Sequence, residues 1–195
     1  MNLAKLFEMQ KELDDRILTE HPIQEGEDRL AKKILALLVE LGELANCWRG
    51  FKYWSYNQKP KTEELGECPL CKGTGDLGTV WAENCIECGG TGKVVVKNPL
   101  LEEYVDGLHF LFSIGLDENV GILEEVEISK CADLTSQFLE LYNAISNLLY
   151  DLSEYPYIFG LYLGLGEMLG FTWKQIEEAY MRKNVVNHHR QENGY

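Results

Sequence analysis

Two pairs of acidic residues in this chain have the spacing of metal ligands carried on helices. Glu40 and Glu43 are three residues apart, and so are Glu103 and Asp106. Residues at this spacing leave an α-helix on the same side, so each pair would present its two carboxylates together. Two helices that face each other could place four carboxylates around one point, which suits a hard cation such as Mg²⁺. One pair alone would be read as a solvated strip, but the second pair favours a metal site.

The segments that carry these pairs have the pattern of largely buried helices. Apolar residues recur at three- and four-residue spacing from Leu30 to Trp48 and again from Leu100 to Leu116. Carboxylates held close together in apolar surroundings repel each other and lose solvation. A proton, a basic partner or a divalent cation is therefore expected beside them.

A cationic stripe lies on the last predicted helix, over residues 173–191. Lys183, Asn187 and Arg190 would share one face of this helix. In a chain this acidic, such a stripe favours the binding of an anion. The alternative is a basic C-terminal turn that complements the helix dipole.

Two further groups have side chains suited to a nucleotide. Gln10 and Asp14 would share a face of a first helix over residues 3–19, as surface groups or as hydrogen-bonding partners of a ligand. Lys52 and Trp54 belong to the aromatic run that follows Trp48. That run is either a hydrophobic plug at the helix end or a base-stacking wall with cations for phosphates.

Four of the six cysteines form two matching knuckles, Cys68-x-x-Cys71 and Cys85-x-x-Cys88, each followed by x-Gly-x-Gly. Their separation fits one tetrahedral Zn²⁺ held by four thiolates, with glycine amides free to face the sulfurs. Such a closed site is structural. Four free thiols in a loop are the alternative. The repeat resembles the zinc modules of DnaJ-type chaperones.

The composition of residues 58–98, rich in glycine and cysteine, differs from that of the flanking segments. We therefore predict two parts: a helical domain over residues 1–57 and 99–195, and an inserted zinc module over residues 58–98. The module could act as a lid or as a docking surface for a protein partner.

Acidic residues outnumber basic ones, with 32 Asp and Glu against 18 Lys and Arg among 195 residues and a formal net charge of −14. This argues against a nucleic-acid surface and against a polybasic membrane anchor. Charges come too early for a signal peptide, and no apolar run is long enough to span a bilayer. We expect a cytoplasmic protein with no nucleic-acid or membrane partner.

Surplus apolar surface predicts a homodimer. In a predicted helix over residues 131–152, apolar residues cover more than one side, and residues 155–170 add a further apolar, glycine-punctuated helix. A helical layer with two apolar sides needs two partners. Gly160 and Gly164 would allow close helix contact, inside the subunit or across the interface.

Taken together, the motifs resemble those of the dimeric dUTPases within the all-α nucleotide pyrophosphatase superfamily. The residues that carry this resemblance are Gln10-x-x-Leu13-Asp14, Glu40-x-x-Glu43, Phe51-Lys52-Tyr53-Trp54, Glu103-x-x-Asp106-x-x-His109-Phe110 and Lys183-Asn184-x-x-Asn187-x-x-Arg190-Gln191. The resemblance implies an all-α homodimer that cleaves dUTP, and also dUDP, to dUMP with Mg²⁺. The family more often has Asn where this chain has Asp14, and the Cys₄ insertion is not part of its common pattern.

The expected mechanism is metal-assisted hydrolysis of a phosphoanhydride. Glu40, Glu43, Glu103 and Asp106 would hold two or more Mg²⁺ ions that bridge phosphate oxygens and acidify a bound water. One of Glu40 and Glu43 would accept the proton of that water.

The remaining polar groups would hold the nucleotide. Lys183, Asn187 and Arg190 would clamp the phosphates, Gln10 and Asp14 would read the uracil edge, and Lys52 and Trp54 would wall the pocket. Three alternatives stay open: a MazG-like pyrophosphatase that acts on another nucleotide such as dCTP, a non-enzymatic zinc-module adaptor, and a co-chaperone.

Overall fold

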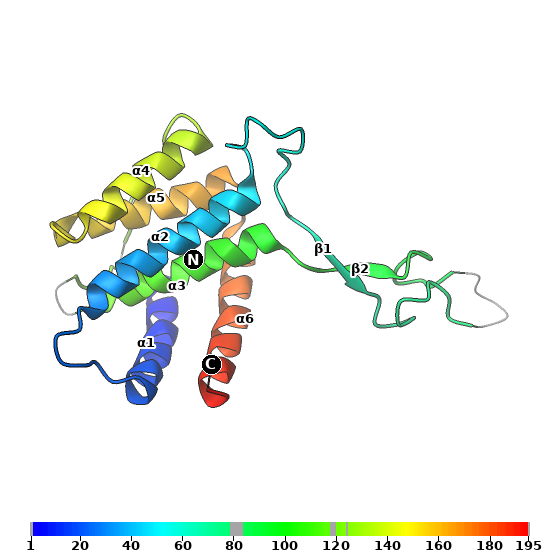
Figure 1. The fold of residues 1–195 in the computed structure, drawn as a ribbon, viewed down its shortest axis with the longest axis horizontal. Helices are drawn as coiled ribbons and strands as arrows, with labels where there is room; N and C mark the ends of the chain where they lie inside the picture. Colours follow the sequence, from blue (N-terminus) through cyan, green and yellow to red (C-terminus); the bar gives the residue numbers. More distant parts are fainter. Residues whose placement is uncertain (1, 79–83, 118–119, 124, 195) are drawn as a thin grey trace.

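Six α-helices make up most of the computed structural model, which describes residues 2–78, 84–117, 120–123 and 125–194 (Figure 1). The elements are α1 (Leu3–Glu20), α2 (Arg29–Trp48), β1 (Glu64–Glu67), β2 (Lys93–Lys97), α3 (Pro99–Gly115), α4 (Leu134–Asn147), η1 (Leu152–Glu154), α5 (Tyr155–Met168) and α6 (Trp173–Glu192). The predicted all-α fold is confirmed. None of the helices in the described ranges is long and apolar enough to cross a membrane.

Polar side chains at the helix starts explain where most of the helices begin. An N-cap side chain accepts a hydrogen bond from a backbone N–H of the first turn at the start of every α-helix except α5. These caps are Asn2, Asp28, Asn98, Asp133 and Thr172. At the other end of α2, Arg49 adopts a left-handed conformation with φ 66°, which stops the helix.

The helix over 131–152 is shorter than predicted, whereas the other predicted helices are observed to within two residues of their expected ends. Asp133 accepts the amide of Ser136, so α4 begins only at Leu134. After Asn147 the chain turns, and Asp151 caps the short helix η1. Local capping thus ends an apolar periodicity that continues on both sides of α4.

The core is built around α3, which packs against α1, α2, α5 and α6 (Figure 1). Most of its residues are buried, including those on more than one side. Tyr104 on α3 and Tyr162 on α5 stack, and each hydroxyl donates to the other residue's backbone carbonyl, at 3.2 and 2.9 Å. Gly107 permits this, because a Cβ there would lie 2.1 Å from the Tyr162 hydroxyl.

Helix α5 is buried inside the chain. The connector before α4 crosses it, with Ser129 N–H donating to Gly160 O, and added Cβ atoms at Gly160 and Gly164 would lie 2.1 and 2.0 Å from connector carbonyls. The glycines therefore provide the close contact predicted for them within the subunit, and they do so against extended chain. Apolar surface that remains exposed includes Leu35 and Val39 on α2 and Leu139 on α4.

A two-stranded arm leaves the helical body between α2 and α3 (Figure 1). Its strands pair antiparallel, with Leu65 opposite Val95. The strand predicted at 94–96 is present as β2, whereas its partner β1 was not predicted. Lys61 is bonded to both helices, through its N–H to Cys47 O and its carbonyl to the N–H of Leu100. The arm proper therefore starts after Lys61, a few residues beyond the predicted start of the insertion.

Candidate active site

A cavity of about 910 Å³ lies between α1, α2, α3 and α6. Because α2 and α3 run antiparallel along it, the cavity has a carboxylate end and a second polar region further along both helices. Glu40 and Asp106 mark the first, and Lys33 and Ser113 mark the second. Four helices from the beginning, middle and end of the chain thus supply side chains to one space.

Three carboxylates converge at the first end. One oxygen from each of Glu40, Glu43 and Glu103 lies within 4.8 Å of the others. Burial, together with the charges of Asp106, Glu43 and Glu103, raises the pKa of Glu40 to about 7. Burial likewise raises the pKa of Glu103 to about 7, helped by Glu43 and Asp106. The donor set consists of oxygens that repel one another, so it fits a divalent cation such as Mg²⁺.

The fourth predicted ligand, Asp106, lies beside this group but is bound to α6. Its Oδ2 accepts a hydrogen bond from Lys183 Nζ at 2.5 Å. Burial raises the pKa of Asp106, and the bond to Lys183 opposes this rise. The other oxygen, Oδ1, is buried and has no hydrogen-bond partner among the described residues. One oxygen of Asp106 thus remains open to a cation.

The predicted cationic stripe faces the cavity. Lys183, Asn187 and Arg190 all line it, and the charge of Arg190 lowers the pKa of Asp106. Lys183 lies near the middle of α6, whereas the dipole of a helix acts within its last turn. The helix-dipole interpretation therefore does not account for Lys183. Its position next to the carboxylates suits an anion that binds together with the cation.

The second region of the cavity is a hydrogen-bonded network around Gln10. Gln10 Oε1 accepts from Tyr180 Oη and from His109 Nδ1, both at 2.7 Å, while Gln10 Nε2 donates to Asp14 Oδ1 at 2.7 Å. Asp14 Oδ2 also accepts from Ser113 Oγ at 2.5 Å and is paired with Lys33 at 3.3 Å. Gln10 and Asp14 are thus brought together in the cavity as the sequence predicted.

Three buried side-chain atoms have no hydrogen-bond partner within the part of the chain that the structure describes. They are Asp106 Oδ1, His109 Nε2 and Gln191 Oε1. All three belong to residues that line this one cavity. An unpaired buried polar group costs about 1–3 kcal/mol, so their concentration here indicates a site completed by a polar ligand.

A protein-family comparison agrees with this geometry. A family model described as dUTPase matches residues 2–67 and 91–195. The chain belongs to the all-α dUTPase family. No curated protein matches it. The match includes all four helices of the cavity and leaves out residues 68–90, which begin at the first cysteine of the predicted zinc module.

In this dUTPase-family chain, the four cysteines of the unmatched segment form one cluster. The Sγ atoms of Cys68 and Cys85 are 3.8 Å apart, and those of Cys71 and Cys88 are 3.7 Å apart. Sulfurs about 2.3 Å from a tetrahedral zinc ion are separated by about 3.8 Å, so the donor set fits Zn²⁺. The predicted amide donors are present: Gly75 N–H reaches Cys71 Sγ and Gly92 N–H reaches Cys88 Sγ, both at 3.2 Å.

Lys52 and Trp54 are not brought to the cavity by this chain alone. Lys52 Nζ lies 5.4 Å above the Phe51 ring, and Trp54 is 64% exposed. Neither residue lines the cavity of this dUTPase-family chain. The predicted wall around the nucleotide is therefore not formed within the described residues.

Other cavity residues were given no role from the sequence. His109 and Ser113 follow Asp106 at spacings of three and seven, so the helical periodicity of α3 could have placed them on the same face. Lys33 precedes Glu40 by seven residues, so the periodicity of α2 could have placed it on the face of the carboxylates in the same way. Tyr180 lies three residues before Lys183, where its ring alone would indicate a core position, although its hydroxyl belongs to the network.

Proposed function

We propose that this chain hydrolyses dUTP to dUMP and pyrophosphate with Mg²⁺, and that it also converts dUDP to dUMP. The observation that carries the proposal is that Glu40, which is clustered with Glu43 and Glu103, lines one end of a cavity together with Asp106 and Lys183. The other region of the same cavity is lined by the polar side chains of Gln10, Asp14 and His109. The family match supports the same class of substrate.

The proposed ligands of two or more Mg²⁺ ions are Glu40, Glu43, Glu103 and Asp106. Bound Mg²⁺ would neutralise charge on phosphate oxygens and make the attacking water more acidic. One of Glu40 and Glu43 accepts the proton of that water. The bond between the α- and β-phosphate groups then breaks, which yields dUMP and pyrophosphate from dUTP, or dUMP and phosphate from dUDP.

Lys183, Asn187 and Arg190 are proposed to hold the phosphates. All three line the cavity from α6, and Lys183 is already oriented by Asp106 at 2.5 Å. An incoming phosphate would offer Lys183 further acceptors, since an ammonium has three donors. Gln10 and Asp14 are proposed to form the base end of the site.

The four cysteines are proposed to hold one structural Zn²⁺. Four thiolates leave no open coordination position for a substrate. The apolar cluster of the arm consists of Cys68, Cys71 and Cys85 with a few partly buried neighbours, so the metal would replace a hydrophobic core. The arm remains a candidate surface for a protein partner.

A homodimer is proposed for the assembled enzyme. The apolar side chains of Leu35 and Val39 are one helical turn apart on α2 and are 62% and 51% exposed. Leu139 on α4 is 65% exposed. These positions, and not the buried α5, are the proposed contact surface. Sedimentation at micromolar concentration tests this, and an active monomer would contradict it.

The activity is tested by pyrophosphate and phosphate release from each deoxynucleoside triphosphate and diphosphate, with Mg²⁺ and with EDTA. We expect dUTP and dUDP to be hydrolysed in Mg²⁺ and none of the nucleotides to be hydrolysed in EDTA. Turnover of dCTP with dUTP left intact would overturn the proposed substrate. Absence of turnover for the whole panel would overturn the enzymatic proposal.

A further inference from the structure

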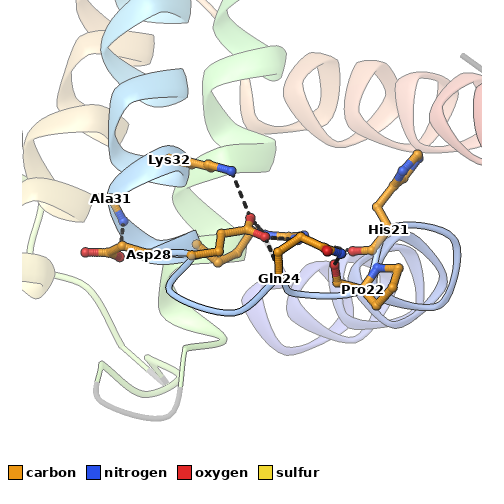
Figure 2. Close-up of polar contacts among 8 residues, drawn as sticks. His21, Pro22, Gln24, Asp28, Ala31 and Lys32 are labelled. Atoms are coloured by element: carbon orange, nitrogen blue, oxygen red, sulfur yellow. Dashed lines mark hydrogen bonds and ion pairs between the residues drawn. The ribbon is translucent and has the colours of Figure 1, made fainter.

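The two adjacent lysines of α2 have different surroundings. Lys33 Nζ lies 3.3 Å from Asp14 Oδ2 and 3.0 Å from Ser113 O, and its side chain is 22% exposed and lines the cavity. Lys32 also borders the cavity, but its ammonium extends toward the α1–α2 connection, where it binds Glu27 at 3.1 Å, and its side chain is 67% exposed (Figure 2). Only Lys33 is held within the polar network of the cavity.

The ammonium of Lys33 has one donor left for a ligand. A lysine ammonium carries three N–H groups, and Lys33 uses two of them on Asp14 and on the carbonyl of Ser113. The remaining N–H is available to an acceptor in the cavity. Since both partners are fixed, the donor is positioned before a ligand arrives.

The same region also contains a buried hydrogen-bond acceptor, the ring of His109, whose tautomer is set by the hydrogen-bonded network around Gln10. Because a carboxylate only accepts hydrogen bonds, the NH₂ group of Gln10 must point toward Asp14. Gln10 Oε1 therefore faces His109 and Tyr180. His109 must then donate through Nδ1, which leaves Nε2 as a bare lone pair. Burial lowers the pKa of His109 to about 3, in keeping with a neutral ring. Nε2 is buried and has no partner among the described residues.

We propose that Lys33 determines base selectivity by donating a hydrogen bond to the carbonyl oxygen of a lactam group at the edge of the base. The ring N–H next to that carbonyl then donates to His109 Nε2. This inference rests on the proposed function and deepens it. Uracil presents such an edge through its 4-oxygen and N3–H. Cytosine presents an amino group to Lys33 and a lone pair to His109, so both contacts become repulsive. Thymine has the same edge as uracil, and its exclusion therefore depends on a different contact.

Lys33 also compensates the charge of Asp14. In Lys33→Met the carboxylate of Asp14 would remain in the cavity without its cation, where it would repel a base carbonyl and attract an amino group. The variant should therefore lose preference for uracil and gain relative preference for cytosine. A charge-assisted hydrogen bond is roughly twice as strong as a neutral one, so the ratio of affinities should change by at least about tenfold.

The test is calorimetric binding of dUMP and dCMP, with Mg²⁺, to the full-length parent, Lys33→Met and Lys174→Met, since Lys174 is exposed and does not line the cavity. We expect the parent and Lys174→Met to prefer dUMP to the same extent and Lys33→Met to lose at least about tenfold of that preference. An unchanged dUMP to dCMP ratio in Lys33→Met, or an equal loss for both ligands, would overturn the proposal.

A measurement on the parent tests the proposal if circular dichroism shows that Lys33→Met does not fold. The monophosphate of the 2-pyrimidinone deoxyriboside lacks both the 4-oxygen and N3–H. We expect it to bind the parent at least about tenfold more weakly than dUMP, and equal affinity would overturn the proposal. These assays follow binding and not turnover, so a changed ratio without dUTP hydrolysis would leave the inference standing while the proposed activity fails.

Discussion

The molecule gathers metal-ligating groups in two places that are built in opposite ways. In the arm, Cys68, Cys71, Cys85 and Cys88 come from two copies of one short turn, and each copy has its own glycine N–H donor to sulfur. In the helical body, Glu40 and Glu43 on α2 meet Glu103 on α3 only because two long helices pack together.

The difference indicates what a metal ion would do at each place. The arm offers four soft sulfurs on a segment with little other core, so removing the metal should remove its structure. The body has a large hydrophobic core without help from the carboxylates, and Glu40 and Asp106 line a cavity that Lys183 and Arg190 also line. The first site is expected to serve folding and the second to serve reaction, and the following experiments can break or sharpen that contrast.

The largest effect is expected from the carboxylates. Glu40→Gln, Glu43→Gln and Glu103→Gln should each lower kcat for dUTP by about 10²–10⁴ with little loss of helicity, because they remove a ligand or base and not core. Steady-state pyrophosphate release and circular dichroism measure the two effects. Glu102→Gln is the matched control, since Glu102 lies next to Glu103 but has a half-exposed side chain that is paired with Lys97 at 3.7 Å. Near-normal rates in two of the three variants would contradict a carboxylate site.

The phosphate clamp should give the next largest effect. Lys183→Ala and Arg190→Ala should weaken binding of a non-hydrolysed dUTP analogue by about 10–100-fold, because each removes a charge-assisted contact with phosphate. Calorimetry measures the affinity. Lys174→Ala is the control on the same helix, since Lys174 is 85% exposed near its start. Unchanged affinity in both clamp variants would favour the alternative, in which these basic residues only complement the helix dipole.

Removing zinc should change the arm and leave catalysis nearly intact. In Cys85→Ser we expect bound zinc to be lost and residues 63–97 to become sensitive to proteolysis, while dUTP turnover stays within about twofold of the parent, because the carboxylates belong to the body. Cys131→Ser, outside the cluster, is the control. Replacing residues 63–97 with a short Gly-Ser linker gives the same test without thiols. A collapse of turnover while nucleotide still binds would place the arm in the catalytic cycle.

The smallest effect is a pH dependence of the metal-free protein. The pKa values of Glu40 and Glu103 rise from 4.5 to about 7 on folding, so the folded state binds more protons in this interval. The unfolding free energy should therefore fall as the pH rises from about 4.5 to about 7, then level off. Mg²⁺ binds the ionised carboxylates and should restore the melting temperature above pH 7 but not at pH 4.5. Thermal melts with and without Mg²⁺ test this, and pH-independent melts would contradict it.

Much of the fold follows from local rules. Five of the six predicted helices end within two residues of their observed ends, because apolar periodicity and capping side chains agree there. In α4 they disagree: the apolar pattern continues past both ends, and Asp133 and Asp151 decide the boundaries. Strand β1 was not predictable from Glu64–Glu67 alone, since its short polar sequence becomes a strand only by pairing with β2.

The candidate site was likewise predictable from the sequence only in part. Helical spacing predicts which carboxylates leave α2 and α3 together, and the structure joins three of them. Spacing does not show that Asp106 is bound by Lys183, because that contact joins helices distant in sequence. Spacing places Lys33 on the face of Glu40, seven residues later, but it does not show the contacts of Lys33 with Asp14 and with Ser113 O, which again join different helices.

The two backbone hydrogen bonds of Lys61 separate the arm from the helical body. Lys61 connects to Cys47 O on one side and to the N–H of Leu100 on the other, so the chain leaves and re-enters the body at neighbouring points. The entropy of closing a loop grows only with the logarithm of its length once its ends are fixed. The helical body is therefore nearly indifferent to what is inserted beyond Lys61. A longer, shorter or unrelated module could be grafted at this junction without changing the register of α2 against α3.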